Sequence, residues 1–141
     1  MRFIPVWVDA TGLAVAAFYN EETALLEFEG QPWAYSARVD NFNGLLKAEA
    51  TTYFSDSTCG GDGGSGYVSF SFPAAAGILP AGTGLNGGYN VPVSTNSVLF
   101  DSNSFINSSG TCVENTVRTA GLPAVPVADP GIVMPMTLQF R

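Results

Sequence analysis

The stretch ATTYFSDSTCGGDGGSGYVSFSF, residues 50–72, decides the fold of this chain. It reads as a strand, a tight glycine-rich loop that carries Cys59, and a second strand. In the second strand, Val68, Phe70 and Phe72 alternate with smaller residues, which is the period of a strand with one buried face. Pro73 ends that strand, because proline cannot donate a hydrogen bond to a ladder. The stretch therefore predicts a fold that is built from short strands.

The second cysteine, Cys112, lies in the motif SSGTCVENTV, residues 108–117. A bond between Cys59 and Cys112 would tie the middle of the chain to its C-terminal third. Two cysteines in a chain with so little charge fit a disulfide framework, and the closed loop of about 50 residues would add about 4 kcal/mol to stability. The alternative is two buried thiols in a reducing compartment. A structural zinc site is excluded, because the chain has no histidine to complete it.

Composition places the 141 residues in one globular domain, residues 1–141, with a real core. Apolar residues make up 46% and charged residues only 12%, which is the opposite of a disordered chain. The net charge of −7 and the absence of a basic patch exclude nucleic acid as a partner and disfavour anionic membrane surfaces. No apolar run is long enough to span a bilayer.

The absence of histidine removes the commonest general base and excludes catalysis by a Ser-His-Asp triad. The candidates for a carboxylate pair of the kind used in glycoside hydrolysis are Glu27, Glu29 and Glu49. Acidic residues that alternate along a strand, however, normally form the solvent-exposed face of a sheet. We therefore expect no enzyme and no cofactor. A small hydrolase of unrecognised type is the third hypothesis, after the two given below.

The succession of short strands and turns predicts an antiparallel β-sandwich or barrel with long Gly/Pro-rich loops. A jelly roll is one form that such a sandwich can take. Over residues 45–50 a helix is the alternative to a strand. The segment 74–88 reads as an irregular loop, either a contact site or a cover pinned by Ile78 and Leu85. The Pro/Ala-rich segment 119–131 reads as an extended strap across the surface. The expected strands cover residues 3–9, 13–19, 23–29, 33–39, 45–54, 67–72, 89–93, 97–101, 111–118 and 132–140, and residues 104–107 run into a turn at residues 108–110.

Several aromatic residues are candidates for contact with a ligand or partner, because exposed Tyr and Trp rings stack on sugars and anchor interfaces. Trp33, directly after a turn, is the best candidate, and Tyr35, Tyr67 and Tyr89 join it. The alternative is that these rings belong to the core. Asp56 and Asp62, which flank Cys59, are candidate calcium ligands, although isolated aspartates in glycine loops usually cap turns.

The motifs around both cysteines resemble a recurring pattern in uncharacterised bacterial and phage-associated proteins. The elements that carry the resemblance are Val8-Asp9-Ala10-Thr11-Gly12, Tyr53-Phe54 with Asp56-Ser57-Thr58-Cys59, Gly66-Tyr67-Val68, Tyr89-Asn90-Val91-Pro92-Val93, Gly110-Thr111-Cys112 and Val125-Pro126-Val127. Members are similar to terminal domains of collagen-like or fibre-like surface and tail proteins. In this chain the loop over residues 60–66 is longer and richer in glycine, and no collagen-like repeat precedes the domain. The resemblance carries no catalytic residues.

The first functional hypothesis is a structural or recognition module that self-associates on a phage tail, a virion or a bacterial surface appendage. Its partners would be copies of itself, other appendage proteins or a surface glycan. The second hypothesis is a secreted carbohydrate-binding module with aromatic platforms. Both place the protein outside the cell or on a virion. The first nine residues are only faintly like a signal peptide, and a first strand is the preferred interpretation.

Overall fold

The structure is a computed structural model, and it is all-β, as the sequence predicts. It describes residues 4–20, 23–28, 31–36, 47–48, 50–69, 79–85, 88–107, 109–127, 132 and 136–141. This part of the chain contains thirteen strands in two sheets and no α-helix. It accordingly offers no helix long and apolar enough to cross a membrane.

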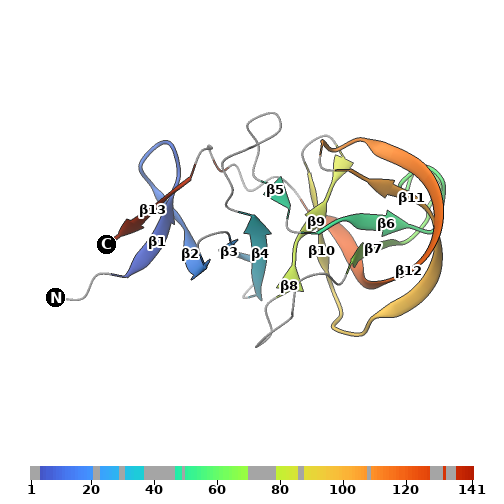
Figure 1. Ribbon diagram of the computed structural model, residues 1–141, viewed down its shortest axis with the longest axis horizontal. Helices are drawn as coiled ribbons and strands as arrows, with labels where there is room; N and C mark the ends of the chain where they lie inside the picture. The colour runs from blue at the N-terminus through green and yellow to red at the C-terminus, as the bar shows by residue number, and fades with distance from the viewer. Residues whose placement is uncertain are drawn as a thin grey trace.

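Sheet A contains seven strands, in the order β13-β1-β2-β3-β4-β5, with β8 paired to β4. The β4–β8 pairing is parallel, and the other pairings in this sheet are antiparallel. Strands β1 and β13 lie at the end of this sheet that is away from sheet B (Figure 1). The strands are β1 (Pro5–Val8), β2 (Ala14–Asn20), β3 (Thr23–Phe28), β4 (Gln31–Ser36), β5 (Lys47–Ala48), β8 (Leu79–Pro80) and β13 (Thr137–Phe140).

Sheet B contains six strands, in the order β11-β6-β7-β12-β10-β9. The additional pairing of β11 with β12 returns the sheet to its first strand, so that β11, β6, β7 and β12 close into a small barrel. Figure 1 shows β12 curving around the outside of this barrel. The strands are β6 (Thr52–Phe54), β7 (Gly66–Ser69), β9 (Gly82–Thr83), β10 (Tyr89–Pro92), β11 (Val98–Ile106) and β12 (Cys112–Val127).

An apolar core joins the two sheets. On sheet A the register places Leu26, Trp33 and Leu79 in one row across neighbouring strands, and the period of two directs this row to one face. Sheet B contributes Tyr89, Val91 and Leu122 to the same buried cluster. The rings of Tyr35 and Tyr89 meet edge to face, with their centroids 5.1 Å apart. The two sheets therefore pack together in a sandwich-like arrangement, one layer of which curls into the barrel.

The predicted strand over residues 45–54 is divided between the two sheets. Its first part is β5 in sheet A, and its last part is β6 in sheet B. An isolated parallel bridge pairs Ala50, between them, with Gly82. The helix that was the alternative over residues 45–50 is excluded at residues 47–48, which are strand, whereas residues 45–46 lie outside the described residues.

Two segments differ from the expected loops and straps. The segment 74–88 was expected to be irregular, but it contains β8 and β9, which pair with β4 and β10; residues 74–78 lie outside the described part. Of the segment 119–131, residues 119–127 are extended as expected, but they form the second half of β12 and pair with β7 and β10, and residues 128–131 lie outside the described part. Pro123 and Pro126 fit there because a proline without an N–H still accepts through its carbonyl, as Pro123 does from Val93.

The inter-sheet core predicts a contrast between two leucines of sheet B. Leu122 is 0% exposed within the core, whereas Leu99 is 61% exposed on β11. Leu122→Ala should lower the free energy of unfolding by about 2–5 kcal/mol, because it leaves a cavity between the sheets. Leu99→Ala, the matched control, should change it by less than about 0.5 kcal/mol. Urea unfolding of both variants checks this, and equal losses would contradict the placement of Leu122 in the core.

Candidate functional site

The glycine-rich loop between β6 and β7 is fixed by the disulfide that the sequence predicts. Cys59 and Cys112 are bonded, with their Cα atoms 6.0 Å apart, and the alternative of two free thiols is excluded. The bond joins the loop to the first residue of β12, 53 positions along the chain. Cys59 has a φ of 52°, in the left-handed region, and Gly60 follows with a φ of 89°. The backbone therefore turns sharply at Cys59, where the disulfide bond is attached.

The side chain of Asp56 organises the rest of this loop. Its carboxylate accepts hydrogen bonds from the backbone N–H groups of Gly60 (2.8 Å), Asp62 (3.0 Å) and Gly64 (3.1 Å). A slight burial raises the pKa of Asp56, but these three bonds and the hydroxyl of Thr58 outweigh it, so that the pKa lies below 3.8. The turn-capping alternative for Asp56 is thus confirmed.

The second calcium candidate, Asp62, is exposed, and its carboxylate accepts from the hydroxyl of Thr58 at 3.1 Å. Within the described residues, no three cysteine or acidic side chains gather closely enough to hold a metal ion. Of the carboxylate-pair candidates, Glu27 is exposed on β3, and Glu29 and Glu49 lie outside the described residues.

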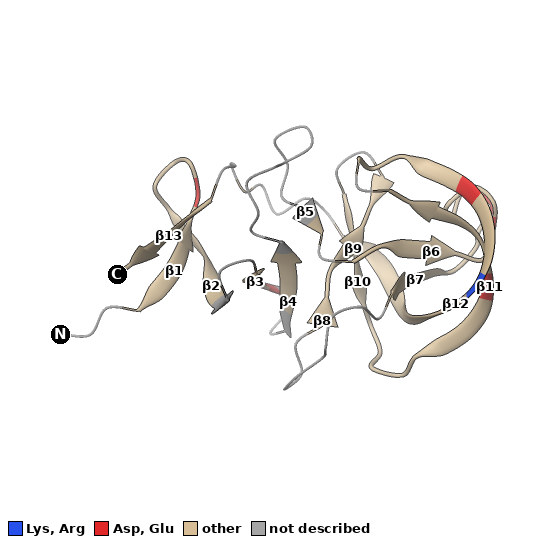
Figure 2. Cartoon of the chain, in the orientation of Figure 1, with Lys and Arg blue, Asp and Glu red and all other residues tan. Residues whose placement is uncertain are grey.

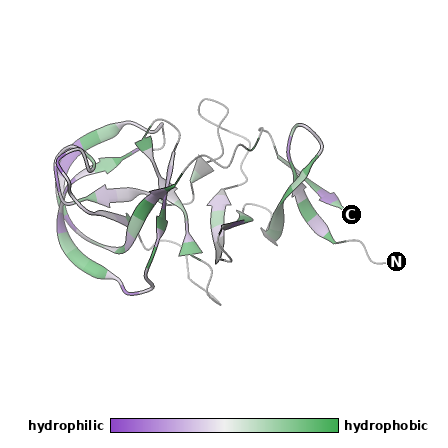
Figure 3. Ribbon diagram, turned by 180° about the vertical axis from the view of Figure 1, so that it is seen from behind, coloured by the Kyte–Doolittle hydropathy of each residue, from purple (hydrophilic) through white to green (hydrophobic). Residues whose placement is uncertain are grey.

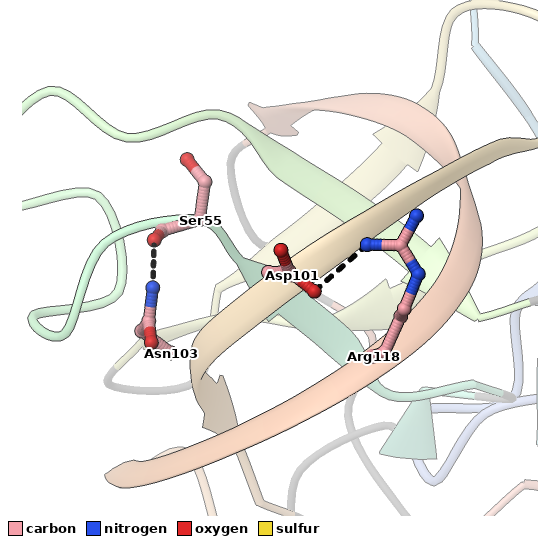
Figure 4. Close-up of polar contacts among 4 residues, drawn as sticks. All are labelled: Ser55, Asp101, Asn103 and Arg118. Atoms are coloured by element: carbon pink, nitrogen blue, oxygen red, sulfur yellow. Dashed lines mark hydrogen bonds and ion pairs between the residues drawn. The ribbon is translucent and has the colours of Figure 1, made fainter.

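Three consecutive side chains of β11 hold the loop from the other side, and the sequence analysis missed them. The hydroxyl of Ser104 accepts from Cys59 N–H at 3.0 Å and donates to the carbonyl of Asp56. The hydroxyl of Ser102 donates to the Phe54 carbonyl at 3.1 Å. The Asn103 amide donates to the Ser55 carbonyl at 2.7 Å, as Figure 4 shows beside the Asp101–Arg118 ion pair. The signal was the polar run Asp-Ser-Asn-Ser at residues 101–104, of which the expected strand over residues 97–101 includes only Asp101.

An open pocket of about 410 Å³ lies beside this loop. Phe54 and Ile106 line it from the barrel, Gly60 and Gly64 line it from the stapled loop, and Leu85 and Val127 line it from the opposite wall. Among the described residues, every side chain that lines the pocket is uncharged. Glycine is required close by at residue 66, because a Cβ there would come within 2.9 Å of the Phe54 ring. The pocket has the size of small-molecule and side-chain sites, and its lining suits an apolar group.

The structure does not place the four candidate aromatic residues together at the surface. Trp33, Tyr35 and Tyr89 are buried in the inter-sheet core, so the alternative interpretation applies to these three. Tyr67 is half-buried, and its ring lies against Phe100 with the centroids 4.1 Å apart. Of the four, only Tyr89 lines the pocket. A flat aromatic platform for sugars is therefore not formed by these residues.

Comparison of this chain with models of protein families, with curated proteins and with solved structures found no match. The class of the protein consequently rests on its own architecture. It is a two-sheet, sandwich-like all-β protein with one disulfide.

The disulfide predicts a reductant-sensitive stability. Replacing both Cys59 and Cys112 with serine should lower the free energy of unfolding by about 4 kcal/mol, because the unfolded chain regains the entropy of a loop of 53 residues. A reductant should destabilise the wild-type protein by a similar amount and leave the double variant unchanged. Urea unfolding with and without reductant measures both effects. A wild-type protein that is equally stable with and without reductant would contradict a stabilising role of the disulfide.

The carboxylate of Asp56 predicts a pH-dependent loop. Because its pKa is lower in the folded state than in the unfolded one, its contribution is present above the ordinary value of 3.8 and is lost as the pH falls through the folded value. Asp56→Asn should remove the charge and speed amide exchange at Gly60 and Gly64 at neutral pH. Asp62→Asn, the control, should affect these amides less. Hydrogen exchange followed by NMR decides this, and equal exchange in the two variants would refute the role of Asp56.

Proposed function

We propose that this chain is a non-enzymatic structural or recognition module that self-associates. The observation that carries the proposal is the exposure of large apolar side chains on a chain with few charges. Contiguous exposed apolar surface on a soluble protein usually marks a site of interaction. One group lies at the end of sheet A, with Ile4, Leu13 and Phe140, and a second lies on sheet B, with Val93, Val98, Leu99 and Val125.

The distribution of charge supports the same proposal. Acidic and basic residues are sparse among the described residues in Figure 2, and long stretches of the strands in both sheets carry neither. Figure 3 shows, from the opposite side, that hydrophobic residues extend along strands of both sheets. Few charges need to be desolvated when such surfaces meet a partner, and this favours association.

The proposed setting is a phage tail, a virion or a bacterial surface appendage. A disulfide persists in oxidising surroundings, which supports a location outside the cell or on a released particle. The resemblance of the cysteine motifs to terminal domains of fibre-like proteins supports the same setting. The absence of histidine from the sequence supports a role without catalysis.

The carbohydrate-binding module ranks second. It needs exposed aromatic rings, and three of the four candidate rings are buried. A glycan array therefore tests the alternative directly, with binding to one glycan class as the result that would favour it over assembly.

Self-association predicts a particle mass that rises with concentration. Light scattering coupled to size exclusion should give a mass above the 14.7 kDa of one chain, and it should increase across a tenfold range of concentration. Sulfate should shift the equilibrium further towards the assembly, because it strengthens apolar burial. A constant mass of one chain in every condition would contradict the proposal.

A further inference from the structure

The end of sheet A that is remote from sheet B presents an uncovered apolar side chain. Phe140 is the last residue of β13, lies opposite Pro5 of β1 and is 64% exposed. By the period of two it shares a face with Leu138, which packs against the inter-sheet core. Sheet B covers this face only further along, as the position of β1 and β13 in Figure 1 shows. Phe140 therefore continues the core face into solvent.

The pocket that sheet B lines offers a cavity on the other sheet from Phe140. Its volume of about 410 Å³ accommodates one aromatic side chain, and none of the described residues that line it is charged. Phe54 and Ile106, which line it, also belong to the buried cluster around the disulfide. An apolar ring that entered the pocket would lie against Phe54 and Ile106, which the disulfide holds in position.

The charges beside the two surfaces are complementary. Arg141 follows Phe140, is exposed, and donates from its guanidinium group to the carbonyl of Gly12 and to the side chain of Gln139. The loop that supplies Gly60 and Gly64 to the pocket carries Asp56 and Asp62 and, over residues 55–65, no basic residue. If Phe140 entered the pocket, the positive charge of Arg141 would thus lie near the negative charges of Asp56 and Asp62.

We propose that Phe140 of one chain inserts into the pocket of a second copy, with Arg141 placed beside the Asp56–Asp62 loop of that copy. The inference rests on the proposed self-association and specifies its contact. The two surfaces are different and lie on different sheets, so the contact is heterologous. Repetition of a heterologous contact gives a ring if it closes and a filament if it does not.

Two variants separate the two halves of this contact. Phe140→Ser removes the inserted group, and Leu85→Lys places a charge at the mouth of the pocket, at a side chain that is already exposed. Each variant alone should associate about 30-fold more weakly than wild type, as expected for the loss of an aromatic hot spot. Val117→Ser, at an exposed apolar side chain of β12 outside the proposed contact, is the matched control and should associate as wild type does.

Mixing the two variants gives the decisive result. An equimolar mixture should form a dimer and stop there, because only one intact pocket and one intact Phe140 remain to pair. Analytical ultracentrifugation of each variant and of the mixture measures this. Circular dichroism first establishes that both variants keep the strand signal of wild type.

A charge exchange tests the orientation without touching the apolar contact. Arg141→Asp and Asp62→Arg should each weaken association several-fold at low salt, and the double variant should regain most of the loss. Self-association of Phe140→Ser and of Leu85→Lys that is as strong as that of wild type would overturn this contact and leave the proposed function standing. Wild-type chains that stay single would overturn both.

Discussion

The bond between Cys59 and Cys112 is the constraint on which the barrel and its pocket depend. It connects the loop after β6 to the start of β12, the strand that completes the barrel by pairing with both β11 and β7. Ser104 and Asp56 then fix the backbone on either side of Cys59 by hydrogen bonds. The glycine-rich loop would otherwise have much conformational freedom to lose on folding. With the staple in place, it forms a wall of an apolar pocket.

The strands and the staple were predictable because they depend on local signals. Alternation along β3 and β7, and the two cysteines, are visible in the sequence. The short strands β8 and β9 were not predictable, because their residues, including Pro80 and Gly82, have low strand propensity and pair only through tertiary contacts. The hydrogen bonds that Ser102 and Ser104 form with residues 54–59 could not be predicted for the same reason, since the partners lie 45 to 48 positions away in the sequence.

The aromatic residues show a second limit of sequence reasoning. Trp33, Tyr35 and Tyr89 look alike whether they face a sugar or a neighbouring sheet, and only the packing of sheet A on sheet B distinguishes the two. Phe140, which the sequence analysis did not single out, is the ring that stays exposed at the end of β13. Whether an aromatic residue of sheet A is buried or exposed depends on how far sheet B extends over that face. The extent of this cover is a property of the whole fold.

We propose that this protein works by joining its apolar surfaces to other molecules, first of all to further copies of itself. Small-angle X-ray scattering of the wild-type protein over a range of concentrations tests this most directly. The account predicts that the longest dimension grows with concentration while the cross-section stays that of one chain, or that it stops at the size of a closed ring. A scattering profile that keeps the dimensions of a single chain at every concentration would contradict it.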